Sequence, residues 1–389
     1  ATGQLSTSEA APAVEAPRIF IDAPLVSGSI SLAGLRVDDI MLKAYQETQD
    51  PDSENIQFLL KTSTAAPFFA EFGWASADAA QPMPKSDSVW TASSMVLSPG
   101  SPVTLTWENG NGLTFRRQLS INDDYMITVD DSVESALSAP LTLFPYGLVR
   151  RHGTPATTGI YILHEGALGV FDETLREEDY DDMRDADGGV SEIRPEMPGG
   201  WIGFTDKYWL AALLPDQSAN MNFAFKSLAG PSDRYQVDYI ASEASVLPAG
   251  GVVSSQTRLF AGAKKVSLLD GYADELGIAN FDLAIDFGWF YFLTKPFFYA
   301  INWLNSLLGN FGLAVLAFTV VVKIFFFPLA NKSYRSMGKM RVLSPKIQEI
   351  RERHADDRMA MNQAMMALYK EEKVNPAAGC LPVLLQIPV

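Results

Sequence analysis

The chain has 389 residues, with 30 lysines and arginines against 46 aspartates and glutamates, a formal net charge of −16 and a sequence pI of about 4.6. This length is enough for two or three domains, at least one of them with a full hydrophobic core. The acidic balance argues against general nucleic-acid binding. Cys380 is the only cysteine, so the sequence excludes an intrachain disulfide and a cysteine-based metal cluster.

The positive charge is concentrated near the C-terminal end of the chain. Residues 331–375 hold ten basic and six acidic side chains, which leaves 20 basic and 40 acidic side chains in the rest. Basic residues directly after an apolar span mark the cytoplasmic side of a membrane, so we expect the acidic bulk on the opposite side. An exported domain without disulfides fits a bacterial periplasm, and a reducing compartment fits the cysteine count equally well.

The two ends of the sequence suggest a fragment. The first residue is Ala1 rather than Met, and no apolar signal segment precedes the acidic region. Residues 1–18 are small, polar and rich in proline turns, which predicts a flexible linker. At the other end, residues 377–389 contain the start of an apolar run that is too short to span a bilayer, so we expect the next transmembrane helix to begin there.

Residues 19–269 have the pattern of a β-rich domain. Short alternating runs with frequent turns, such as "PVTLTWENGNGLTFRRQLSI", are typical of strands, and few stretches favour a helix. The Asn109-Gly110-Asn111-Gly112 segment between two alternating runs predicts a hairpin turn. Many strands over some 250 residues favour one large β-sandwich.

Residues 270–310 open as a short linker helix and then become strongly aromatic. Phe297, Ile301, Leu304 and Leu308 recur at helical spacing, and Pro296 suits a first helical turn. The aromatic residues favour a headgroup boundary, so we expect an amphipathic helix lying along the outer membrane surface. A buried core helix is the alternative.

Residues 311–329 are long and apolar enough for a transmembrane helix, and a buried helix of a soluble protein is the weaker alternative. Residues 330–376 then predict a cytoplasmic pair of antiparallel helices. Ser344 and Pro345 have the chemistry of a helix start, and Asp356 or Asp357 can cap the second helix.

Lys323 is the informative residue of the apolar segment. A charged side chain near the bilayer centre costs about 2.5–3.5 kcal/mol on insertion. Lys323 is six residues from Leu329, so its amine could instead reach the cytosolic headgroups. However, Thr319 lies one helical turn earlier on the same face, and a polar stripe suits a water-filled cavity open to the cytosol. Such a cavity would attract acidic or polar segments of a polypeptide.

The predicted hairpin is rich in methionine, and this enrichment has two interpretations. The side chains can pack the two helices together. Flexible thioethers also suit a surface that contacts many different apolar partners. The candidates for contact with a substrate or the ribosome are Met359, Met361, Met365 and Met366.

Signatures of an enzyme are missing. His152, His164 and His354 have no ligand spacing, and the S-x-x-K match at residues 336–339 lacks its partner motifs. The acidic stretch from Arg176 departs from the pattern of a calcium-binding EF-hand loop, so a solvated loop is the simpler interpretation. We therefore expect no catalytic residue, no metal and no cofactor.

Several segments resemble the YidC-type membrane protein insertases. The most specific are "FPLANKSYRSMGKM", "LSPKIQEIRER", "MMALYKEEKVNP" and "GCLPVLLQIPV", and the aromatic segment "DFGWFYFLTKPFFYAINWLNSLLGN" is similar to the family's interfacial helix. More loosely, the β-rich region resembles the large periplasmic domain of Gram-negative members. The resemblance implies a periplasmic β-supersandwich followed by an α-helical membrane region. It also implies an inner-membrane location, with the hairpin in the cytoplasm.

The resemblance further implies a non-enzymatic function. Family members insert and help fold inner-membrane proteins, alone or with the Sec translocon, without a cofactor. The implied partners are nascent membrane proteins, the Sec translocon, the ribosome and membrane lipids. Members use a hydrophilic groove with one positive residue, usually arginine, and here Lys323 occupies that position while Thr319 falls on a groove-facing one. The alternative function is a membrane-tethered periplasmic module that binds carbohydrate or peptide.

Overall fold

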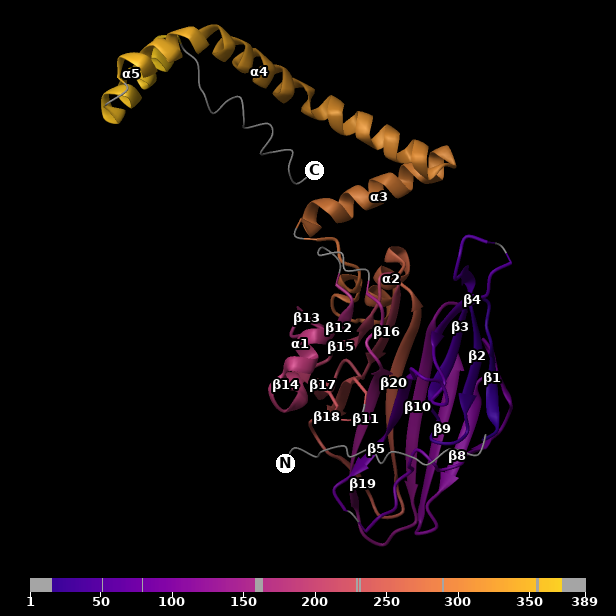
Figure 1. Cartoon of the computed structure of the whole chain (residues 1–389). Coiled ribbons are helices and arrows are strands. Elements are labelled where there is room, and N and C mark those ends of the chain that lie inside the picture. Colours follow the sequence, from indigo (N-terminus) through magenta and orange to yellow (C-terminus); the bar gives the residue numbers. More distant parts are fainter. Residues whose placement is uncertain are drawn as a thin grey trace. The chain divides into compact units, whose positions relative to one another are not determined.

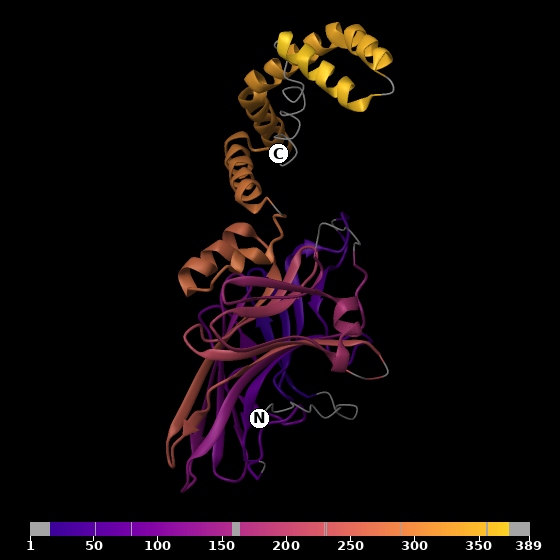
Figure 2. The same ribbon diagram turned by 90° about the vertical axis from the view of Figure 1, so that its left-hand side faces the viewer.

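The computed structural model describes residues 16–50, 52–78, 80–157, 164–228, 230, 232–288, 290–354 and 357–372, apart from the side chains of Lys332, Ser336 and Met337. The chain divides into two compact units, Ala1–Asp286 and Phe287–Val389. Figures 1 and 2 show that the first is built from strands and the second from helices. Most of the expected linker over 1–18 and all of 377–389, with Cys380, lie outside the described residues.

The first unit is a β-sandwich of two large, mostly antiparallel sheets (Figure 1). One sheet has eleven strands, with β14-β17-β18-β11-β5-β3-β2-β1-β7 in spatial order, β19 beside β11 and β4 beside β3. In chain order these strands are β1 Arg18–Asp22, β2 Val26–Ser31, β3 Val37–Gln46, β4 Asn55–Leu59, β5 Phe68–Ser76, β7 Val96–Leu97, β11 Leu141–His152, β14 Val190–Pro198, β17 Asn220–Ser227, β18 Arg234–Ala241 and β19 Ser245–Leu247.

The other sheet has nine strands in the order β13-β12-β15-β16-β20-β10-β9-β8-β6. Their bounds are β6 Thr91–Ala92, β8 Val103–Glu108, β9 Leu113–Ile121, β10 Met126–Ser135, β12 Gly166–Phe171, β13 Thr174–Asp179, β15 Trp201–Thr205, β16 Trp209–Leu214 and β20 Val252–Ala263. The short helical elements of this unit are α1 Tyr180–Asp185, η1 Asp187–Gly189, α2 Val266–Leu276 and η2 Phe281–Ala284.

Alternation in the sequence explains why these segments form a sandwich. Along β9, every second side chain is buried between the sheets and those between them face solvent, as expected for a half-buried antiparallel strand. The predicted hairpin at residues 109–112 is confirmed, because β8 and β9 pair on either side of it. Its turn is fixed by the Asn109 side chain, which accepts hydrogen bonds from the backbone N–H groups of Asn111 and Leu113.

The last residues of the first unit are packed into the sandwich. Phe281 is fully buried, and its ring lies edge-on to Trp201, at 5.3 Å between centroids, and to Phe260, at 5.7 Å. The Asn280 side chain donates a hydrogen bond to the backbone carbonyl of Glu173. These contacts fix the segment through which the chain leaves the sandwich.

A half-buried lysine, Lys264, directly follows β20. The Lys264 amine donates a 2.8 Å hydrogen bond to the Thr205 hydroxyl. Burial lowers the pKa of Lys264 to about 8, against the opposing effect of nearby carboxylates that include Asp206 and Glu165. The folded state therefore releases this proton more readily than the unfolded chain, in which lysine has a pKa of about 10.4.

The depressed pKa predicts a pH-dependent stability. Between about pH 8 and 10.4 the unfolded chain holds a proton that the folded chain has released, so the Lys264 contribution to the free energy of unfolding rises with pH in this window. Below about pH 8 both states are protonated and the contribution is constant. In urea unfolding followed by tryptophan fluorescence, Lys264→Met should remove a rise on the order of 3 kcal/mol. The exposed Lys85→Met is the control, and a rise that persists in Lys264→Met would contradict the prediction.

The second unit contains three helices, α3 Tyr291–Leu308, α4 Phe311–Arg353 and α5 Arg358–Glu371. The predicted helix start at Ser344-Pro345 is wrong, because α4 continues through Pro345 and also through Pro328. A proline within a helix removes one backbone hydrogen bond, and the turns on both sides still hold the helix together here. Of the two predicted caps, Asp357 is confirmed, since its carboxylate accepts hydrogen bonds from the N–H groups of Met359 and Ala360, and Asp356 lies outside the described residues.

Candidate functional site

The N-terminal half of α4 has the composition of a membrane span. An 18-residue stretch of this helix has a mean hydropathy of 2.4, and only 6% of it is buried. By length and composition this stretch can cross a membrane, and the elements that the structure describes leave most of it exposed. Asn310 begins the helix, with its side chain accepting a hydrogen bond from the N–H of Leu313 at 3.1 Å.

Thr319 and Lys323 lie one helical turn apart on this half of α4, and both side chains are exposed. The Thr319 hydroxyl donates a 2.8 Å hydrogen bond to the carbonyl of Val315. Its proton is therefore used within the helix, while its lone pairs remain able to accept. The Lys323 amine has no hydrogen bond or ion pair with the described residues, and it offers three donors. Together the two side chains can bind a group that carries both donors and acceptors.

Helix α3 packs against α4 through Phe297. This residue belongs to the face of α3 that was predicted from the sequence to lie on the membrane surface. The rings of Phe297 and Phe318 meet edge-on, with centroids 5.0 Å apart. A second apolar stripe on α3 is exposed and consists of Phe292, Tyr299, Trp303 and Leu307. Sequence reasoning missed this stripe because aromatic residues occur around most of the helix, and periodicity alone does not say which of two apolar faces meets a neighbouring helix.

The hairpin separates the four candidate methionines into two pairs. Helix α5 folds back on the end of α4, where the Lys346 amine lies 2.7 Å from the Glu372 carboxylate. Met359 and Met366 are exposed, at 73% and 66%, whereas Met361 and Met365 are half-buried. The spacing of Met359 and Met366 places them on one face of α5. Both interpretations of the methionines are thus represented, each by a different pair.

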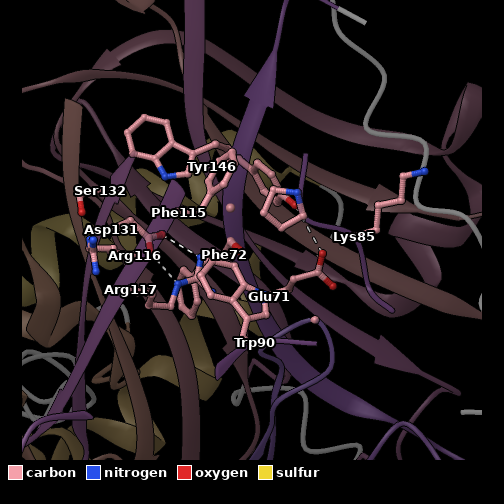
Figure 3. Close-up of a pocket in the computed structure, with 14 residues that line it drawn as sticks. Glu71, Phe72, Lys85, Trp90, Phe115, Arg116, Arg117, Asp131, Ser132 and Tyr146 are labelled. Atoms are coloured by element: carbon pink, nitrogen blue, oxygen red, sulfur yellow. Dashed lines mark hydrogen bonds and ion pairs between the residues drawn. The ribbon is translucent and has the colours of Figure 1, made fainter. Parts of the chain in front are cut away.

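A second candidate site is a small pocket within the first unit, shown in Figure 3. Its volume is about 20 Å³, enough for one water molecule and far too small for a sugar ring. Aromatic rings line much of it, including those of Trp90 and Phe72. As it stands, this pocket does not support a carbohydrate-binding function.

A buried ion pair forms one wall of the pocket. The Arg117 guanidinium makes two hydrogen bonds to the Asp131 carboxylate, at 2.6 and 2.8 Å, and a third to the carbonyl of Phe72 on the opposite sheet, at 2.9 Å. Burial opposes the charge of Arg117, but the charge and hydrogen bonds of Asp131 outweigh it and raise the pKa of Arg117. Its guanidinium also lies 5.7 Å from the ring of Trp90. The pair therefore connects the two sheets and has a structural role.

This geometry predicts a large effect of removing one partner. Asp131→Asn leaves the Arg117 charge buried without its counter-charge, so we expect the free energy of unfolding to fall by about 3–5 kcal/mol. Urea unfolding followed by tryptophan fluorescence measures this change. The matched control is Glu134→Gln, which breaks the exposed pair of Glu134 with Arg116 on the same two strands and should change stability only slightly. Similar effects of the two substitutions would contradict the structural role of Arg117.

The described residues contain no group of three or more His, Cys, Asp or Glu side chains that could hold a metal ion. His164 pairs with Asp179 at 3.1 Å and lies in the first unit, whereas His354 ends helix α4. In the apolar half of α4, residues 311–329, the polar side chains are one cation, Lys323, and one hydroxyl, Thr319.

Two protein-family models match this chain, one described as the YidC periplasmic domain over residues 18–300 and one as the 60Kd inner membrane protein over residues 303–389. The chain belongs to the YidC family of membrane protein insertases. Among its relatives, membrane protein insertase YidC of Methylobacterium sp. (strain 4-46) is 49% identical over 96% of this chain. YidC of Beijerinckia indica is 47% identical over 99%, as is that of Granulibacter bethesdensis.

The chain spans 61% of the Methylobacterium relative, 63% of the Beijerinckia relative and 67% of the Granulibacter relative. Membership of the family confirms the expected location of an inner-membrane protein with a periplasmic domain. Among solved structures, a galactose mutarotase-like protein from Lactobacillus casei covers 63% of this chain, with 99% of its own length aligned, at 13% identity and a TM-score of 0.42. That likeness is too low to carry an argument about function.

Proposed function

We propose that this chain forms part of an insertase that receives nascent membrane proteins in a hydrophilic groove, with Lys323 and Thr319 on the groove wall. The observation that carries the proposal is the exposed Thr319–Lys323 pair on an apolar helix of membrane-spanning length, in a chain of the YidC family. Insertion in this scheme involves binding and release, and no bond of the substrate is broken.

The chemistry of the two side chains suggests how a substrate is held. The Lys323 ammonium attracts carboxylates and backbone carbonyls of a hydrophilic segment, and the lone pairs of Thr319 accept from its N–H groups. Apolar residues of the substrate then move out into lipid, where their transfer is favourable. A lysine offers a compact charge in place of the planar fork of an arginine, so the proposed contact depends on charge and not on paired parallel hydrogen bonds.

An exposed apolar stripe on α3 and the basic hairpin of the second unit suggest further contacts. The stripe of Phe292, Tyr299, Trp303 and Leu307 on α3 has the amphipathic aromatics that favour the lipid headgroup region. We therefore propose that α3 contacts lipid through this stripe. On its other side, α3 contacts helix α4 through Phe297. The basic hairpin of α4 and α5 suits the ribosome and emerging chains, and the Sec translocon is the expected partner in the membrane.

The test of the groove uses the full-length protein with a photo-crosslinking residue in place of Thr319. Stalled ribosomes present a short single-span membrane protein, and a crosslink from residue 319 to the nascent chain is the expected result. Lys323→Glu should lower the yield for substrates with acidic leading segments at least fivefold, since reversing one charge contact is worth on the order of 1 kcal/mol or more. Lys323→Arg is the control and should keep the yield.

Two outcomes would contradict the groove. A probe at position 319 that reacts only with lipid would mean that the Lys323 amine reaches the headgroups and that α4 is a tether. Equal crosslinking of acidic and neutral substrates by Lys323→Glu would remove the electrostatic part of the proposal.

The methionine pairs give a second, independent test. Met359→Gln with Met366→Gln removes exposed apolar surface from α5, and we expect crosslinks between the hairpin and apolar nascent segments to fall about two- to fivefold, because partial burial of each side chain is worth a fraction of its full transfer energy. Met359→Leu with Met366→Leu is the matched control and should keep the crosslinks. Met361→Gln with Met365→Gln should instead loosen the hairpin, which limited proteolysis detects. A loss in the leucine variant equal to that in the glutamine variant would exclude a general apolar contact.

A further inference from the structure

The outer face of the nine-stranded sheet contains a hollow of about 610 Å³ that is distinct from the proposed groove. Every residue that lines it is polar or charged. The hollow lies over β8, β9, β10 and β20, which are neighbours in the sheet (Figure 1). A polar face toward solvent is ordinary for an antiparallel sheet, so the argument depends on how its side chains are arranged and paired.

Strand register places four of these residues in one row across the sheet. Thr104 is opposite Gln118, Gln118 is opposite Asp130, and Asp130 is opposite Gln256. A second row beside it contains Ser132 opposite Ser254. Hydroxyl, amide and carboxylate groups are thus repeated at the spacing of neighbouring strands, about 4.8 Å.

Several of these groups are free to bind a ligand. The side chains of Thr104, Gln118, Ser132 and Ser254 make no hydrogen bond with the residues that the structure describes. By contrast, the charged groups are engaged: Asp130 accepts from Gln256 at 2.6 Å, and Arg116 pairs with Glu134 at 2.9 Å. The hollow therefore offers neutral donors and acceptors, and its one lining cation, Arg116, is already paired.

We infer that this hollow binds a neutral oligosaccharide. Sugars carry closely spaced hydroxyls that both donate and accept, which matches the free hydroxyl and amide groups. The repeat of a β-linked pyranose chain is close to the spacing between strands, about 4.8 Å, so a glycan running across the strands presents one ring to each member of the row. Because no aromatic ring lines the hollow, the sugar is held by hydrogen bonds exposed to water, and the affinity is in the millimolar range.

The test measures binding of cellotetraose and chitotetraose to the whole chain by saturation-transfer NMR. A phosphocholine detergent is required, because the sugar headgroup of a maltoside would compete for the hollow. We expect saturable binding that weakens at least tenfold in Thr104→Val with Gln118→Leu, which removes two hydrogen-bonding groups while nearly keeping their size. The matched control is Ser120→Ala with Thr128→Val, on the next row of the same face and outside the hollow, and it should bind as the parent does.

Each other outcome overturns the inference. Absence of binding at 20 mM sugar, roughly tenfold above the expected dissociation constant, excludes a glycan site here. Equal weakening of binding by the control pair excludes it as well. Binding of a neutral hydrophilic peptide in place of either sugar would assign the hollow to extended polypeptide. Circular dichroism of each variant separates lost binding from lost folding. None of these results bears on Lys323, so this site and the proposed groove are tested separately.

Discussion

The organisation of the second unit depends on the cost of placing one ammonium group within an apolar helix. That cost is about 2.5–3.5 kcal/mol near the bilayer centre. The whole free energy of unfolding of a native protein is only about 5–15 kcal/mol, so the cost is large. Lys323 has no counter-charge among the described residues, so the free energy must be recovered from water, headgroups or a passing polypeptide. Thr319 does not relieve the cost in this structure, because its hydroxyl oxygen accepts no hydrogen bond from the Lys323 amine. This uncompensated charge is the reason why we propose that the exposed Thr319–Lys323 pair binds a segment of a substrate.

The first unit solves the same electrostatic problem in the opposite way. Arg117 is buried between the sheets with two hydrogen bonds to Asp131 and a third to Phe72. Its charge is balanced within the protein, and the cavity beside it has room only for water. One cation thus has a structural role and the other is available for binding, and the difference lies in the neighbours that the fold supplies.

Much of this architecture could be predicted from the sequence. Period-two alternation and the Asn109–Gly112 turn predicted the strands, because an antiparallel sheet with one solvated face requires apolar and polar residues to alternate along each strand. The cap at Asp357 was predictable for the same reason, being local. Pairings between distant segments were not: Arg117 bonds a carbonyl 45 residues away, and Phe281 is buried against strands far earlier in the chain. Nor could spacing distinguish Met359 from Met361, because burial depends on where α5 contacts α4.

The predicted helix start at Pro345 was wrong for a different reason. Proline is favoured at the start of a helix, but this preference does not exclude a helix that continues through it.

The continuity of α4 has a mechanical consequence. With 43 residues the helix is about 65 Å long, and one uninterrupted backbone joins the Thr319–Lys323 pair to the hairpin that α5 completes. A load on the hairpin is transmitted along this rod as tilt or rotation of the apolar half, without any loop to absorb it. Pro328, five residues beyond Lys323, is where a backbone hydrogen bond is missing and bending is easiest. Bending of α4 is therefore easiest at Pro328, which lies close to Lys323, the charged residue of its apolar half.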